Sequence, residues 1–399
     1  MRPKTVAVIG GGIVGLASAY KLLHAPGRPS VVVYEKEDQV GQHQSGHNSG
    51  VLHCGLHYRP GSLKAKLAVA GIREMTQFCE AHDIAHELCG KVVVASAEKD
   101  LPRLDELERR GRANGLTGLR RLSVDELRER EPHARGLAAL LVPEEGLADF
   151  PGVCWALQSE IERMGGEVVC GTRVEGLRTE RDGWRVLTSA GDRSADFVLG
   201  CGGLFADRIA RMAGARIQMS IVPFRGEYYT LRSERAHLVR HMIYPVPDPD
   251  FPFLGVHLHR RLDGSSEGGP TAVLAFAREG YSLGTLNGWD MADAFFTPGL
   301  WRFASLYPQM CASELGRSLS LKSFARALRR LVPEVRDQDL VRGRTGVRAQ
   351  GLKGNGRLVE DFHLVERDRD LHVLNAPSPA ATASLAIGGA VASKVLARL

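Results

Sequence analysis

Short apolar runs alternate with segments of helical periodicity along much of the chain. Residues 4–9 form an apolar run typical of a buried parallel strand, and residues 30–34 form a second, β-branched run. Between them, a glycine-rich turn at 10–15 leads into a segment with helical periodicity that ends at Pro26-Gly27. This pattern predicts a strand–helix–strand unit within about 35 residues.

Similar alternation continues to the C-terminus. Helices are predicted over 62–83, 100–114, 151–166, 290–332 and from about 382, and strands over 91–96, 167–200 and 217–280. We expect an α/β fold, α+β overall, in which a Rossmann-like nucleotide-binding domain carries an inserted antiparallel-sheet substrate domain. The first domain is predicted from residues 1–85, 146–215 and 340–399, and the second from residues 86–145 and 216–339.

Composition narrows the class of protein. The 399 residues are 44% hydrophobic and 25% charged, which is typical of a globular chain and excludes a disordered or fibrous one. The seven cysteines contain no CxxC pair, so we expect neither disulfides nor a zinc site. No signal-peptide pattern or uninterrupted apolar stretch of about 18 residues is present, so we expect a cytoplasmic protein. The net charge of +6 suits an anionic substrate or an acidic membrane surface, and nucleic acid is not needed to explain it.

The glycine turn is the clearest chemical motif. Gly10 allows a tight turn, Gly12 allows backbone to approach a pyrophosphate, and Gly15 allows helix and strand to pack closely. Phosphates would then meet free N–H groups at the helix N-terminus. Glu35 ends the second strand, where a carboxylate binds ribose hydroxyls. The motif predicts dinucleotide binding and leaves FAD and NAD as alternatives.

Polar side chains and glycines are interleaved from Gln44 to Tyr58, directly after the predicted ribose-binding strand. Such a loop can present N–H and hydroxyl groups to a cofactor. Its surroundings contain four histidines, at 43, 47, 53 and 57, which could titrate near neutral pH. No carboxylate or thiol cluster accompanies them in the sequence, so we predict no metal.

Eight segments together resemble the L-2-hydroxyglutarate dehydrogenases/oxidases of the D-amino-acid-oxidase-like FAD superfamily. They are GGGIVGLASA, EKE, HQSGHNSGVLHCGLHYRPGSLKAKL, VPFRGEYY, YPVPDPDFPFLGVH, AVLAFAREGY, GVRAQ and NAPSPAATASLAIG. The resemblance spans essentially the whole chain and has local departures. His57 stands where the family tends to have tyrosine, His259 where it tends to have threonine, and Arg344-Thr345 replaces a small pair; residues 264–269 are also unusual.

The resemblance implies FAD as cofactor and a D-amino-acid-oxidase-like fold. It implies that the pyrophosphate, the adenosine, the flavin and the ribityl chain are held by Gly10, Gly12, Ile13, Val14, Gly15, Glu35, Lys36, Ser45, Gly46, His47, Asn48, Ser49, Val174, Gly202 and Gly388.

The implied reaction is oxidation of L-2-hydroxyglutarate to 2-oxoglutarate. It requires a base for the hydroxyl proton and transfer of the α-hydrogen as hydride to flavin N5. Histidine suits the base, and His53 is the first candidate because its loop returns toward the flavin; His257 is the second. Either could instead be a structural histidine.

A five-carbon dicarboxylate requires cationic or multiple polar donors. Candidate substrate-binding residues are the arginines Arg225 and Arg348 and the neutral donors Tyr58, Tyr228 and Gln350. Arg225 could instead form a strand-end ion pair.

Alternative functions share parts of this pattern. An oxidase or dehydrogenase of another small 2-hydroxy or amino acid, or of glycerol 3-phosphate, would share the N-terminal motif. An NAD-binding or tRNA-modifying protein is a further alternative, suggested by the basic helix at 318–332. Electrons could pass to a quinone or to oxygen.

The segment 324–331 raises the question of membrane contact. Apolar Phe324, Ala327, Leu328 and Leu331 recur at helical spacing opposite arginines. This pattern fits peripheral association with an anionic inner-membrane surface, where a quinone could be reached, and equally fits a core-facing helix.

Overall fold

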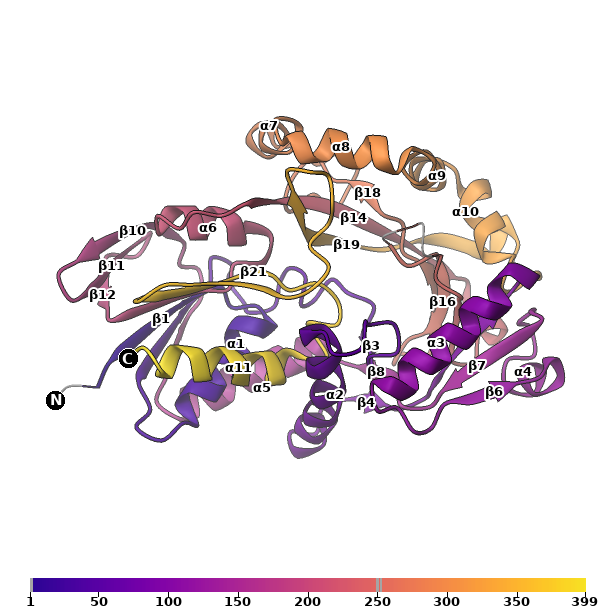
Figure 1. Ribbon diagram of the computed structural model, residues 1–399, viewed down its shortest axis with the longest axis horizontal. Helices are drawn as coiled ribbons and strands as arrows, with labels where there is room; N and C mark the ends of the chain where they lie inside the picture. Colours follow the sequence, from indigo (N-terminus) through magenta and orange to yellow (C-terminus); the bar gives the residue numbers. More distant parts are fainter. Residues whose placement is uncertain (1–2, 249–250, 252) are drawn as a thin grey trace.

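The computed structural model describes residues 3–248, 251 and 253–399. Two sheets form its framework, with helices along their outer faces (Figure 1). In the YPVPDPDFPFLGVH segment, positions 249, 250 and 252 lie outside the described residues. No helix in the described part of the chain is long and apolar enough to cross a membrane.

The first sheet has six strands in the order β20–β21–β13–β1–β2–β9. The predicted strand–helix–strand unit is confirmed, with β1 parallel to β2 and α1 between them in the chain. The bounds are β1 (Thr5–Ile9), α1 (Ile13–Leu23), β2 (Ser30–Tyr34), β9 (Glu167–Val169), β13 (Phe197–Gly200), β20 (His363–Glu366) and β21 (Asp370–Asn375). Only β20 runs antiparallel to its neighbour.

Both faces of this sheet are covered. On one face lie α1, α5 (Phe150–Arg163) and α11 (Ser384–Leu396), whose apolar side chains share the largest core cluster with Val6 and Val8. The other face packs its Ala7 and Val198 against a small antiparallel sheet. That sheet contains β10 (Val174–Glu180), β11 (Gly183–Thr188) and β12 (Arg193–Ala195).

The second sheet has nine strands and is mainly antiparallel. Its path is β18–β14–β17–β16–β15–β5–β7–β6, and β19 pairs with β14. The bounds are β5 (Lys91–Ala95), β6 (Arg120–Leu122), β7 (Ala138–Val142), β14 (Met219–Leu231), β15 (Met242–Pro245), β16 (His257–Arg260), β17 (Ser266–Gly269), β18 (Val273–Leu274) and β19 (Leu340–Lys353). The division into two domains stays a prediction; β19, assigned to the first, is hydrogen-bonded to β14 of the second.

A second small antiparallel sheet contains three short strands. Its strands are β3 (Val51–Leu52), β4 (His86–Glu87) and β8 (Gly146–Ala148), in the order β3–β8–β4. The remaining α-helices are α2 (Leu63–Ala81), α3 (Leu101–Ala113), α4 (Val124–Arg130) and α6 (Ala206–Met212), with short 3-10 turns at Glu98–Asp100, Gly203–Phe205, Ser233–Leu238 and Asp337–Asp339.

The predicted helical region 290–332 consists of four short helices rather than one. They are α7 (Gly288–Phe295), α8 (Pro298–Leu306), α9 (Pro308–Leu319) and α10 (Leu321–Leu328). Two begin at prolines, because proline fits the first helical turn and cannot continue a preceding helix. All four follow one edge of the molecule (Figure 1).

Of the two alternatives left open for residues 324–331, the structure shows the core-facing helix and not an apolar face presented to a membrane. Phe324, Leu328 and Leu331 are almost completely buried in a core cluster, and the ring centroid of Phe324 lies 4.5 Å from that of Tyr229. The amphipathic pattern of α10 therefore reflects packing inside the protein.

Candidate active site

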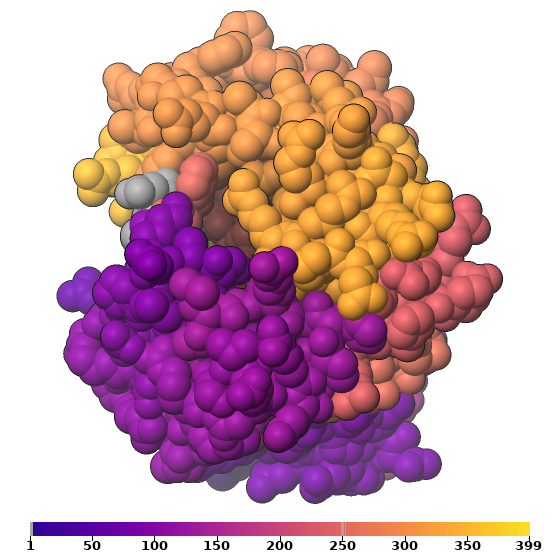
Figure 2. Space-filling view, turned by 90° about the vertical axis from the view of Figure 1, so that its right-hand side faces the viewer, coloured from indigo at the N-terminus to yellow at the C-terminus, as the bar shows by residue number. Residues whose placement is uncertain are grey.

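One large cavity connects the first sheet with the second. Its volume is about 1410 Å³, and its lining includes the ends of β1 and β2 as well as residues of β14, β16 and β19. This exceeds the roughly 300–1,000 Å³ of ordinary small-molecule sites, leaving room for a dinucleotide and a substrate. Figure 2 shows a hollow on one face, between the purple and the orange parts of the chain.

The glycine turn forms one end of the cavity. Gly10 has φ +114°, and a Cβ there would lie 2.4 Å from the carbonyl oxygen of Cys201. A Cβ at Gly15 would lie 2.1 Å from the oxygen of Gly10, so this glycine allows the predicted close packing of helix and strand. Gly12 is the N-cap of α1, whose first turn holds no acidic residue, and it lines the cavity. The turn is therefore shaped for close approach of an anionic group.

Glu35 lies beside this turn, almost completely buried. Its Oε2 accepts a hydrogen bond from Gly11 N at 2.8 Å, and its Oε1 accepts one from Glu37 N at 3.0 Å. The carboxylate lines the cavity at the end of β2, and Val174 of β10 lines the same region. A ribose bound here would meet a preoriented acceptor.

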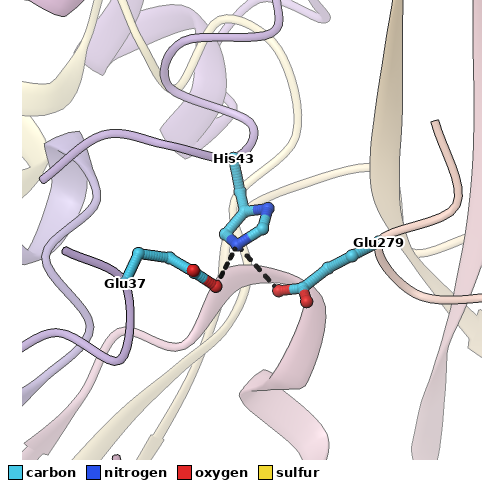
Figure 3. A group of neighbouring side chains, drawn as sticks. All are labelled: Glu37, His43 and Glu279. Carbon is cyan, nitrogen blue, oxygen red and sulfur yellow. Dashed lines mark hydrogen bonds and ion pairs between the residues drawn. The ribbon is translucent and has the colours of Figure 1, made fainter. Parts of the chain in front are cut away.

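Glu37, His43 and Glu279 form a charged cluster at this end (Figure 3), and Lys36 also belongs to it. His43 Nε2 lies 3.0 Å from Glu37 Oε1 and 2.8 Å from Glu279 Oε1. Geometrically the three residues could hold a metal ion, but Lys36 Nζ lies 2.7 Å from Glu279 and also contacts Glu37. The lysine ammonium already supplies the positive charge among these carboxylates. Burial opposes ionisation of Glu279, yet hydrogen bonds from His43 and Lys36 lower its pKa to about 2.

Both candidate bases line the cavity away from the glycine turn. His53 follows β3, and its Nδ1 lies 3.5 Å from Oε2 of Glu145. His257 begins β16, stacks on Tyr244 with ring centroids 3.8 Å apart, and has Nδ1 3.0 Å from the oxygen of Gly255. Burial holds the pKa of His257 well below its usual value, so that ring is neutral.

Arg348 reaches the cavity from β19. Its Nη1 donates to the oxygen of Thr271 at 3.0 Å, its guanidinium lies 5.8 Å from the ring centroid of Phe253, and burial lowers its pKa. No carboxylate of the described residues forms an ion pair with it. Lys64 is a second such cation, which sequence reasoning missed: Nζ lies 4.9 Å from the Tyr58 ring centroid, and burial lowers its pKa to about 8.

The structure corrects the prediction for Arg225. Its side chain does not line the cavity and is only 1% exposed. Its guanidinium is bound by Glu227 at 3.0 Å, and Nη1 donates to the oxygen of Ser282 at 3.2 Å. The ion pair that sequence reasoning left as the alternative is therefore present, although Arg225 lies in the middle of β14 and not at a strand end.

Three of the predicted cofactor-binding glycines do not line the cavity, and Gly15 of the glycine turn is one of them. Gly388 does not line the cavity but lies within α11, where a Cβ would come 2.7 Å from the backbone of Ala17; it allows α11 and α1 to approach. A Cβ at Gly46 would lie 2.7 Å from the oxygen of Gly41, so Gly46 shapes its loop and does not line the cavity. The other predicted residues that line it are Ile13, Val14, Lys36, Ser45, His47, Asn48, Ser49, Gly202, Tyr58, Tyr228 and Gln350.

Beneath the candidate bases lies a pair of charges that the sequence analysis did not single out. Lys91 Nζ lies 2.7 Å from Glu145 Oε2, and both side chains are fully buried. Lys91 begins a strand whose other residues are apolar, which is an unusual place for a lysine and the available sequence signal. For Lys64, the signal is a cation in the first turn of α2, where the helix dipole favours anions.

The chain was compared with known proteins. The family model for FAD dependent oxidoreductases (DAO) matches residues 5–394. The chain belongs to this family. It is 45% identical to the L-2-hydroxyglutarate dehydrogenase of Indibacter alkaliphilus over 98% of this chain and 99% of that protein, and 42% identical to the mitochondrial one of Nematostella vectensis over 98% and 90%.

A solved structure shows the same fold at low identity. The L-alpha-glycerophosphate oxidase of Mycoplasma pneumoniae, with FAD bound, superposes with a TM-score of 0.80 at 21% identity, covering 100% of this chain and 95% of that one. Family membership confirms the expected class, an FAD-dependent oxidoreductase, and decides the FAD-or-NAD alternative left open by the glycine motif.

Proposed function

We propose that this protein oxidises L-2-hydroxyglutarate to 2-oxoglutarate with FAD. The observation that carries the proposal is one continuous cavity, with the glycine turn and Glu35 at one end and His53 and Arg348 further along. Near-full-length similarity to L-2-hydroxyglutarate dehydrogenases supports the choice of substrate.

The residues at the glycine turn fit FAD. Backbone at Gly10, Gly12, Ile13 and Val14 would hold the pyrophosphate, Glu35 the ribose and Val174 the adenine. Lys36, Ser45, His47, Asn48, Ser49 and Gly202, which also line the cavity, would surround the rest of the cofactor. When bound, FAD supplies a hydride acceptor at N5.

His53 is the proposed base. Its Nδ1 lies 3.5 Å from Glu145 Oε2, and we assign Nε2 as the ring nitrogen for the substrate hydroxyl. The substrate loses this proton to Nε2 and loses the α-hydrogen with its electron pair, which together give the keto acid. His257 remains the second candidate, since its neutral ring also lines the cavity.

Arg348 and Lys64 are proposed to bind the two carboxylates of the substrate, with Tyr58, Tyr228 and Gln350 as neutral donors. The support is that both cations line the cavity and that neither forms an ion pair with a carboxylate of the described residues, although the charges of Asp361 and Glu360 act on Lys64. A buried cation of this kind is stabilised by an anionic ligand.

We also propose that electrons pass to a membrane quinone, with oxygen as the alternative acceptor, and that the protein associates peripherally with the membrane. The apolar part of the support comes from α7 and α8, and the basic part comes from side chains on and near α8 and α10. Three large aromatic side chains are exposed on this edge of the molecule: Trp289 (85%), Phe296 (86%) and Trp301 (59%). Several exposed apolar rings in one area are unusual on a protein surface. Exposed basic side chains on α8, on α10 and in the turn after α10 favour an anionic surface: Arg302, Lys322, Arg326 and Arg330.

The substrate proposal is tested by mixing the purified flavoprotein anaerobically with single substrates and following the loss of flavin absorbance. L-2-hydroxyglutarate should bleach the flavin faster than its D-isomer, lactate, malate, D-amino acids or glycerol 3-phosphate. Faster bleaching by any of the others would replace the proposed substrate.

A further inference from the structure

Glu145 lies at the centre of a buried network below the cavity. Its Oε2 is 2.7 Å from Lys91 Nζ and 3.5 Å from His53 Nδ1, and its Oε1 is 3.5 Å from Cys54 Sγ. Lys91 Nζ also donates to Nε2 of His57 at 3.2 Å. The network therefore connects a residue at the cavity wall to a fully buried ion pair.

The fold brings these residues together through strand pairing. β3 pairs antiparallel with β8, so that Leu52 lies opposite Gly146, and the residues adjoining that pair are His53 and Glu145. Lys91 begins β5, opposite Val142 of β7. Lys91 thus lies on a strand, and His53 and Glu145 directly adjoin paired strands, which favours precise side-chain placement.

Stability alone is a weak reason for such a pair. Removing two charges from water costs several kcal/mol per ion, and apolar residues of similar volume are often at least as stable. The position of the pair, within 3.5 Å of the candidate base, suggests a chemical role.

We propose that Glu145, balanced by Lys91, is a positioning residue for His53. It orients the ring through Nδ1, directs Nε2 to the substrate, and stabilises the positive charge that the ring gains with the substrate proton. This inference rests on the proposed role of His53 as base.

Lys91 has the complementary role. An isolated carboxylate beside His53 would hold the ring in its protonated form, which cannot accept a proton; the ammonium partly cancels that effect. His57 completes the arrangement, because burial and the Lys91 charge hold its pKa well below the usual value, so its neutral Nε2 can accept from Lys91. Other titratable groups that face the network are Cys54, Tyr58, Tyr244 and His257.

The test uses the flavin-loaded enzyme and anaerobic stopped-flow measurement of flavin reduction by L-2-hydroxyglutarate across pH. The variants are E145Q, K91M, the double variant K91M/E145Q, H53N and H53N/E145Q. Flavin content and the thermal midpoint of unfolding show which variants are folded. K91M/E145Q leaves neither charge of the buried pair without its partner. It therefore replaces E145Q or K91M in the test if either single variant fails to fold.

We expect E145Q to slow flavin reduction about 10- to 100-fold and to move the acidic limb of the pH profile to lower pH, because the protonated ring loses its negative partner. K91M should move that limb to higher pH. In the H53N background, E145Q should cause little further loss, because two residues that act as a unit are not additive. K91M/E145Q should remain slow, since the orienting carboxylate is absent.

Different failures are distinguishable. If H53N alone leaves flavin reduction unchanged, the proposed base is wrong and this inference fails with it. Two outcomes would contradict only the positioning role, provided that H53N slows flavin reduction. One is an equal loss of rate from E145Q with and without His53. The other is a shift of the acidic limb of the pH profile by E145Q in the same direction as by K91M. Flavin reduction in K91M/E145Q at the wild-type rate would also overturn the positioning role of Glu145.

Discussion

Nε2 of His259 lies 3.1 Å from Oε1 of Glu267, with both side chains fully buried, and Arg344 Nη2 lies 2.7 Å from the same oxygen. These residues belong to three separate departures from the family pattern: position 259, the segment 264–269 and position 344. They form one charge-balanced cluster adjoining the cavity wall, since the His259 ring centroid lies 6.1 Å from that of Tyr228. We interpret the departures as mutually compensating.

Glu267→Gln should lower the free energy of unfolding by about 3 kcal/mol at neutral pH, because it removes the anion from a buried group of charges. Burial opposes ionisation of Glu267, but its contacts with His259 and Arg344 lower the pKa to about 2, against an ordinary 4.5. The stabilisation is therefore complete above about pH 4.5 and is lost as pH falls toward 2. Urea unfolding across pH should show the difference from wild type narrowing in that range. Glu334→Gln, at an exposed pair with His133, is the control and should cost less than about 1 kcal/mol.

Gly12→Asp should abolish most FAD binding while the fold survives, since it places bulk and negative charge at the N-terminus of α1. Glu35→Ala should weaken binding less, through loss of the ribose acceptor and of the bond to Gly11 N. The measurement is flavin absorbance per protein in the purified variants. Gly354→Asp, at an exposed glycine with nothing within 4 Å of an added Cβ, should retain full flavin. Full occupancy in Gly12→Asp would contradict the cofactor assignment.

Arg348→Met should raise KM for L-2-hydroxyglutarate more than for 2-hydroxybutyrate, which lacks the distal carboxylate, if Arg348 binds the distal end. Steady-state kinetics with both substrates provide the comparison. Equal penalties would mean that Arg348 binds the shared C1 carboxylate. Arg225→Met is the control. Because Glu227 binds the Arg225 guanidinium, this substitution should lower the stability of the protein and should change KM equally for the two substrates.

Binding to liposomes should require anionic lipid and weaken with salt. Replacing Trp289, Phe296 and Trp301 by serine should reduce co-sedimentation strongly, because these rings are exposed on α7, the α7–α8 junction and α8. Replacing Arg326 and Arg330 by glutamine should weaken only the part of the liposome binding that depends on salt concentration. Co-sedimentation that is indifferent to lipid charge and to both sets of changes would favour a soluble acceptor.

The local pattern predicted well wherever one segment determines the outcome. The strand–helix–strand unit, the glycine turn and Glu35 at the end of β2 all follow from short-range rules.

Prediction failed where the partner lies far along the chain. The amphipathic face of α10 fits a membrane and a core equally, and only its packing against Tyr229 decides between them. Likewise, no spacing rule connects Glu145 to Lys91 and His53. Arg225 is a different case: its partner Glu227 lies only two residues away on β14, and the sequence leaves the ion pair open as an alternative, whereas Arg348 forms no ion pair within the described residues.

The most direct test of the central claim is the rate of anaerobic flavin reduction by L-2-hydroxyglutarate in the wild type and in His53→Asn. The account predicts that the substrate bleaches the wild-type flavin and that His53→Asn retains FAD but reacts roughly 10²–10⁴-fold more slowly, the usual loss for a general base. A wild-type flavin that L-2-hydroxyglutarate does not bleach would contradict the substrate, and an unchanged rate in His53→Asn would contradict the base.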